Sequence, residues 1–273
     1  MTDSFDDHSP TPPPERASFP DGVRFAFGTL TVLPARITRW DRPAARTGMA
    51  CAPLAGLVVG LLAAVPGALL LVLGGGPLLA AAVTVAVPAA LTRGLHLDGL
   101  ADTADGLGSA KPADEALRIM KQSDIGPFGV VALVLALLVQ VAALSDAYAD
   151  SWNRGALAAV TAAVTARLAM TLASREGVPP ARPEGLGAAV AGVVPRAAAA
   201  AVTALVVVLA AVAALPLGLP AAGRQAAAVL AALLVAELLL RRCVRRFDGV
   251  TGDVFGAVAE VSATTALIVL ALG

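Results

Sequence analysis

Residues 48–73 have the sequence GMACAPLAGLVVGLLAAVPGALLLVL, 26 positions without a charged side chain. A helix needs about 20 apolar residues to cross the hydrocarbon core of a bilayer. This segment is therefore long enough to span a membrane, and it sets the fold class expected for the rest of the chain.

The composition of the whole chain leads to the same class. Of its 273 residues, 58% are hydrophobic and 15% charged, which is too little polar surface to cover a water-soluble protein of this size. We expect an all-α, polytopic integral membrane protein whose solvent is the lipid bilayer. The 20 basic and 20 acidic side chains balance, so no net charge favours a nucleic-acid partner.

About seven transmembrane helices are predicted, and the second and fourth are the weakest. Their ranges are 48–73, 77–93, 127–146, 155–173, 197–215, 224–241 and 250–272. The apolar segment RFAFGTLTVLP, residues 24–34, is too short to span and is expected to be interfacial or re-entrant. Residues 1–20 are polar and proline-rich and are predicted to be a disordered tail, which leaves residues 21–273 as one membrane-embedded domain.

The basic residues predict the orientation, because cytoplasmic loops retain Lys and Arg. With the N-terminus inside, 17 of the 20 basic residues fall in inner segments, and the outer loops keep only Arg154 and Arg224. We therefore expect a multi-pass protein of the plasma membrane, which in a bacterium is the inner membrane, with its polar motifs on the cytoplasmic side.

An acidic motif, HLDGLADTADG, occupies residues 96–106. On a helix, Asp98, Asp102 and Asp105 would share one face, and three stacked carboxylates repel one another unless a cation lies among them. Hard oxygen ligands favour Mg²⁺, Mn²⁺ or Ca²⁺. The alternative is a solvated acidic helix end, but the apolar flanks place the cluster near lipid, where unpaired carboxylates are costly.

A second acidic motif, GVTGDVFGAVAE, opens the last span at residues 249–260. Asp253 and Glu260 are seven residues apart and lie on one helical face. Gly252 and Gly256 form a G-x-x-x-G step that favours close helix packing.

Basic residues in two inner loops are candidates for phosphate contact. Lys121 and Ser123 precede a helix start, although a loop with an ordinary N-terminal cap explains them equally well. Arg175 and Arg182 are candidate anion clamps, and topology charge explains Arg182 as well. Arg167 lies inside the fourth span and would either snorkel or pair with Glu237.

The motifs together resemble those of the cobalamin synthase family, the adenosylcobinamide-GDP ribazoletransferases. The matching segments are HLDGLADTADG (96–106), IMKQSDIGPFG (119–129), EGLG (184–187) and GVTGDVFGAVAE (249–260), in family order. One departure is that Asp124 follows Ser123, where family members often carry the acid before the serine.

The resemblance implies a transferase. In this reaction α-ribazole, or its 5′-phosphate, displaces GMP from adenosylcobinamide-GDP with Mg²⁺ as cofactor, late in cobalamin biosynthesis. We expect the metal to be held by four carboxylates, catalysis to involve four side chains, and phosphate to be contacted by three. The metal ligands would be Asp98, Asp102, Asp105 and Asp253; the catalytic residues His96, Asp98, Asp102 and Glu260; and the phosphate contacts Lys121, Ser123 and Arg175.

Two other functions are compatible with intramembrane acids. One is a membrane phosphotransferase of the CDP-alcohol type, whose acidic motif carries an arginine at a position where this chain has Asp102. The other is a cation-coupled transporter, which would commonly show an internal repeat. No convincing duplicate of the Asp motif is present. The sequence is compatible with a homo-oligomer.

Overall fold

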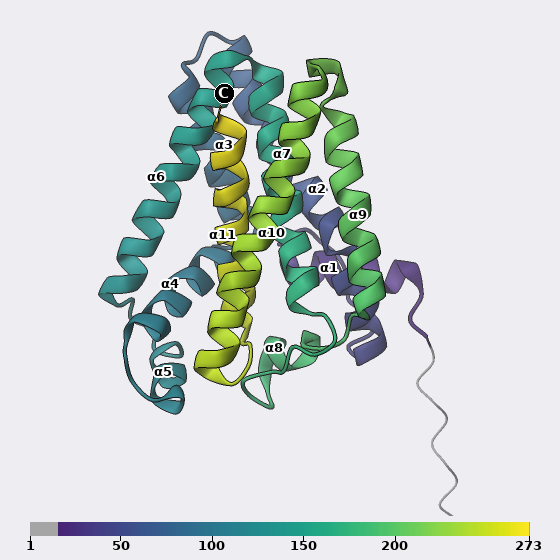
Figure 1. The fold of residues 1–273 in the computed structure, drawn as a ribbon, viewed down its shortest axis with the longest axis vertical. Coiled ribbons are helices and arrows are strands. Elements are labelled where there is room, and N and C mark those ends of the chain that lie inside the picture. The colour runs from purple at the N-terminus through teal and green to yellow at the C-terminus, as the bar shows by residue number, and fades with distance from the viewer. Residues whose placement is uncertain (1–15, 273) are drawn as a thin grey trace, which may run out of the picture.

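The computed structural model describes residues 16–272, and over this range the chain is an all-α bundle (Figure 1). Its elements are α1 (Phe19–Leu30), α2 (Arg42–Val72), α3 (Pro77–Leu91), α4 (Leu95–Gly108), α5 (Ala113–Ile119), α6 (Pro127–Asp150), α7 (Trp152–Ala173), α8 (Gly185–Val190), α9 (Arg196–Ala213), the 3₁₀ turn η1 (Leu215–Leu217), α10 (Leu219–Phe247) and α11 (Gly252–Ala271).

The all-α polytopic class is confirmed, with a smaller number of clear spans than expected. Within residues 16–272, five helices are long and apolar enough to cross a membrane, namely α2, α6, α7, α9 with η1, and α11. A sixth arises only if α3 and α4, which are bent by 87° at their junction, count as one span. All seven expected ranges fall on helices, but α3 has only 15 residues and α10 carries Arg224 and Glu237 within its apolar stretch.

The outer surface of the bundle is apolar. Large hydrophobic side chains on several long helices point outward and have no protein neighbour to cover them, as expected for contact with lipid tails. They include Val65 and Leu69 of α2, Leu135 and Leu138 of α6, Leu205 and Leu209 of α9, and Leu230 and Leu234 of α10.

The two ends of the bundle differ in structure. The lower end in Figure 1 contains α5, α8, the oblique helix α4 and the turn between α10 and α11, whereas the C-terminus lies at the opposite end. The segments predicted to be inner loops therefore gather at one end. Arg154 and Arg224 lie at the other, at the starts of α7 and α10.

The first helix begins earlier than predicted. Residues 1–15 of the expected tail lie outside the described residues, but Ser18 caps α1, which starts at Phe19 rather than after residue 20. This helix is 12 residues long, too short to span, as predicted for this segment. Cys51 and Cys243 are both free and buried, which fits apolar packing.

Helices α4 and α11 touch through their backbones. A Cβ atom at Gly99 would lie 2.6 Å from the carbonyl oxygen of Asp253, and one at Gly256 would lie 3.0 Å from that of His96. The close packing predicted from the G-x-x-x-G step is therefore real at Gly256, whereas the nearest atom to a Cβ at Gly252 is Leu186 Cβ, 4.0 Å away. This contact fixes how the two acidic motifs face each other.

Gly99→Ala is expected to lower stability, since the new methyl group would overlap backbone that cannot rotate away. The cost should be about 1–3 kcal/mol, measured as a fall in the unfolding temperature of the detergent-purified protein. Gly223→Ala in α10 is the matched control, because nothing lies within 4 Å of its Cβ position. It should be neutral or slightly stabilising. Equal effects of the two substitutions would contradict the close α4–α11 contact.

Candidate active site

The acidic face of α4 begins at a sharp bend. Arg93 and Gly94 both have positive φ, 54° and 71°, and so turn the chain out of α3 into α4. Asp98 and Asp102, one helical turn apart, then line a cavity of about 510 Å³ together with the loop that contains Ser123. Of the three acids predicted to share a helical face, Asp98 and Asp102 line this cavity together, whereas Asp105 does not line it.

Asp105 has a different environment. Its Oδ2 accepts a hydrogen bond from the backbone N–H of Gly126 at 2.8 Å, and its Oδ1 accepts one from Gly129 at 3.0 Å. These N–H groups begin α6 and would otherwise have no helical partner. The carboxylate of Asp105 therefore caps α6, and both of its oxygens are engaged there.

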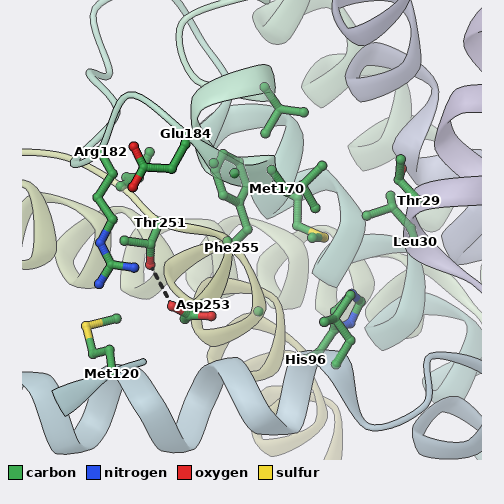
Figure 2. Close-up of a pocket in the computed structure, with 18 of the residues that line it drawn as sticks. Thr29, Leu30, His96, Met120, Met170, Arg182, Glu184, Thr251, Asp253 and Phe255 are labelled. Atoms are coloured by element: carbon green, nitrogen blue, oxygen red, sulfur yellow. Dashed lines mark hydrogen bonds between the residues drawn. The ribbon is translucent and has the colours of Figure 1, made fainter. Parts of the chain in front are cut away.

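A second cavity, of about 410 Å³, lies between the start of α4 and the start of α11 (Figure 2). His96 from α4 and Asp253 from α11 point into it, and Arg182 reaches in from the loop that precedes α8. Asp253 accepts a hydrogen bond from Thr251 at 3.1 Å, and Lys121 forms a 3.7 Å ion pair with Glu184 at the rim. The remaining wall is apolar and is formed by residues that include Leu30, Met49, Met170 and Phe255.

The two cavities adjoin at Leu95, which lines both. The acids on either side of it interact: burial, followed by the charges of Asp253, Asp98 and Asp105, raises the pKa of Asp102 from 3.8 to about 7. Helix α4 lies outside the five clear spans, so this group is at the polar end of the bundle. Like charges held this close favour a cation or a proton among them.

No group of three or more His, Cys, Asp or Glu side chains within residues 16–272 lies close enough to hold a metal by itself. Asp98, Asp102 and Asp253 nevertheless interact through their charges across the α4–α11 contact. All four predicted metal ligands thus interact through their charges, but Asp105 also caps α6 with both of its oxygens.

Other predicted residues are found at several depths. Ser123 lines the cavity of Asp98, and Lys121 lines that of Asp253. Arg175 lines neither of these cavities; it donates to Glu237 at 2.8 Å and to the carbonyl of Leu172 at 2.7 Å. Glu237, which was predicted as a partner of Arg167, therefore pairs with Arg175. Glu260 lies deeper in the bundle, in a separate small cavity.

Three residues of the second cavity were not assigned to the site from the sequence. Arg182, Glu184 and Thr251 all line it. Glu184 was known only as part of the EGLG motif, and Arg182 was a candidate anion clamp that topology charge also explained. The charge of Arg182 acts on Asp253, and its guanidinium also donates to the carbonyl of Leu117. Only the folded loop reveals that it faces the acid.

Comparison with known proteins identifies the family of this chain. The profile of the cobalamin-5-phosphate synthase family matches residues 22–271, nearly the whole chain. The chain belongs to this family. The match includes both acidic motifs and the loops that line the two cavities, so the site is built from segments shared with cobalamin-5-phosphate synthases.

Individual relatives match over similar lengths. An adenosylcobinamide-GDP ribazoletransferase of Frankia casuarinae is 45% identical over 268 residues, covering 92% of this chain and 94% of the relative. One from a Nocardioides species is 39% identical over 255 residues, covering 91% and 97%. No solved structure matches the chain. Membership of a cobalamin synthase family identifies the protein as an enzyme.

Asp105→Ala is expected to destabilise the protein by about 1–3 kcal/mol, since it leaves two backbone N–H groups of α6 without an acceptor. Asp98→Ala, at an exposed carboxylate with no capping role, should leave the unfolding temperature nearly unchanged. Thermal unfolding in detergent without added metal compares the two. If Asp105→Ala were as stable as the wild type, the capping role would be wrong.

Proposed function

We propose that this chain catalyses the Mg²⁺-dependent transfer of the adenosylcobinamide phosphoryl group from adenosylcobinamide-GDP to α-ribazole or its 5′-phosphate. A hydroxyl oxygen of the ribazole would form a new bond to the phosphorus attached to the corrinoid. The pyrophosphate P–O bond would break, GMP would leave, and the hydroxyl proton would pass to a base. The names of the relatives from Frankia and Nocardioides support this reaction.

The observation that carries the proposal is the meeting of two acidic helices beside a basic group. Asp98 and Asp102 of α4 interact with Asp253 of α11, and Arg182 acts on Asp253 from the opposite wall. Phosphoryl transfer depends mainly on positioning and on neutralising charge at the phosphates. Carboxylates and a guanidinium around one space are the groups that this chemistry needs.

Magnesium fits this donor set. Mg²⁺ usually takes one or two carboxylates and completes its shell with water and substrate phosphates, so a cage of three protein ligands is not required. Asp102 and Asp253 would hold the ion, with Asp98 beside them. When bound, it would neutralise the pyrophosphate and stabilise the departing GMP.

The other side chains divide the remaining tasks. Arg182 and Lys121 would bind phosphate oxygens, and their position in the lining of the Asp253 cavity supports this role. Ser123 would donate to a phosphate from the adjoining cavity, which it lines. The proton acceptor would be His96 or one of the carboxylates, since these groups border the space where a hydroxyl would approach. The apolar wall of Leu30, Met170 and Phe255 offers contact to an uncharged part of a substrate.

The protein would lie in the plasma membrane, and its site would face the cytoplasm. The end of the bundle that contains both cavities also contains most of the basic residues, and cytoplasmic ends carry this excess.

Asp102→Asn and Asp253→Asn are each expected to reduce Mg²⁺-dependent GMP release by roughly 10²-fold or more, because each removes a charge that the ion and the pyrophosphate need. Purified protein and chromatographic detection of GMP make the measurement. Asp150→Asn is the control, since Asp150 pairs with Arg154 at the opposite end of the bundle. Full activity of both site variants at normal protein levels would refute the metal assignment.

The requirement for Mg²⁺ should depend on pH. A protonated Asp102 cannot bind the ion, and its pKa in the metal-free protein is about 7. The Mg²⁺ concentration for half-maximal activity should therefore fall as pH rises from 6 to 8, by up to roughly tenfold, and level off above pH 8. A requirement that stays constant over this range would contradict the proposed role of Asp102.

A further inference from the structure

Arg167 is a buried cation inside the bundle. It lies on α7 with 3% of its surface exposed, and its Nε and Nη2 atoms are buried without a hydrogen-bond partner among the described residues. Six residues separate it from the end of α7, which places it about 9 Å inside the helix end. A guanidinium has five N–H donors, and leaving the three on Nε and Nη2 unpaired at this depth is costly.

Two acceptors lie within the reach of its charge. The carboxylate of Glu260 on α11 and the imidazole of His96 on α4 both interact electrostatically with Arg167. The buried Nε2 atom of His96 also has no partner. Among the described residues, however, no ion pair within 4.0 Å and no hydrogen bond joins Arg167 to Glu260.

The space next to these groups is large enough for water. A cavity of about 60 Å³ is lined by the polar side chains of Arg167, Glu260, Gln140 and Thr84 among apolar neighbours. Gln140 donates to Glu260 Oε2 at 3.0 Å and holds that carboxylate at the cavity wall. A polar cavity of this size with several partners takes up water, whereas apolar cavities stay empty.

We propose that ordered water in this cavity joins Arg167 to Glu260, and that the resulting charge pair is a positioning device for the active site. Glu260 follows Asp253 by seven residues on α11, and His96 precedes Asp98 by two on α4. Arg167 on α7 thus interacts electrostatically with both helices that carry the site acids, at a position deeper in the bundle than those acids. The pair itself is independent of the proposed reaction; only its effect on the site rests on that function.

A double-mutant cycle in detergent tests the pair. Arg167→Met leaves the Glu260 charge uncompensated, and Glu260→Gln leaves that of Arg167, so each should lower the unfolding temperature by roughly 5–15 °C. The double variant carries neither charge and should recover at least half of the combined loss. If a single variant cannot be purified, recovery of folded double variant supports the pair equally. Additive losses, or two harmless single variants, would overturn it.

Arg175 and Glu237 provide the matched control. They form a direct 2.8 Å ion pair whose side chains are 25% and 21% exposed, and Glu237 also accepts from Arg241 at 2.7 Å. Solvent and a second cation already compensate this acid, so the cycle of Arg175→Met and Glu237→Gln should show a much smaller coupling. Equal couplings in the two cycles would mean that burial gives the Arg167 pair no special weight.

The positioning role has its own readout. Arg167→Lys keeps the charge but loses the planar fork, so it should retain most of the thermal stability while raising the Mg²⁺ concentration for half-maximal activity several-fold. A merely structural residue would change stability and leave this concentration unchanged. That outcome would remove the positioning role, while absence of any transfer activity in the wild type would refute the proposed function and leave the thermal cycle intact.

Discussion

The backbone contact between α4 and α11 is the constraint on which the site depends. Gly99 and Gly256 let the two helices approach more closely than any side chain would permit. Because the contact is flanked by Asp98, Asp102 and Asp253, it brings together acids that are 151 and 155 residues apart in sequence. Burial of Asp102, together with the repulsion among these acids, is the cost of this arrangement, and both raise the pKa of Asp102.

Several local devices support that contact at the end of the membrane-spanning bundle. The left-handed residues Arg93 and Gly94 turn α4 away from α3, so that its acids lie across the bundle end instead of passing into the lipid. Asp105 then ties α4 to the start of α6 through two backbone N–H groups. Deeper in the bundle, Arg167 and Glu260 add a charged level beneath the site. Asp105 satisfies backbone N–H groups that would otherwise lack an acceptor, and Arg167 and Glu260 compensate each other's charge.

Much of the fold followed from the sequence, because long apolar helices and the distribution of arginines are local signals. The helical spacing of Asp98 and Asp102 and the packing at Gly256 were also predictable from short periodicities. The contacts of Asp105 and Arg175 were not predictable. A carboxylate that caps a helix and one that binds metal have the same spacing, and Arg175 meets Glu237 only through tertiary packing. Arg182 and Arg167 show the same limit: their partners, Asp253 and Glu260, are set by tertiary packing alone.

Joint binding of one divalent ion by α4 and α11 is tested most directly by Mn²⁺ binding measured with electron paramagnetic resonance, which requires no substrate turnover. Purified wild-type protein with GDP present should bind Mn²⁺ at a site that is lost or weakened in both Asp102→Asn and Asp253→Asn. Magnetic coupling of the bound ion to the phosphorus nuclei of GDP should accompany it. A site that survives either substitution unchanged would contradict shared ligation by the two helices.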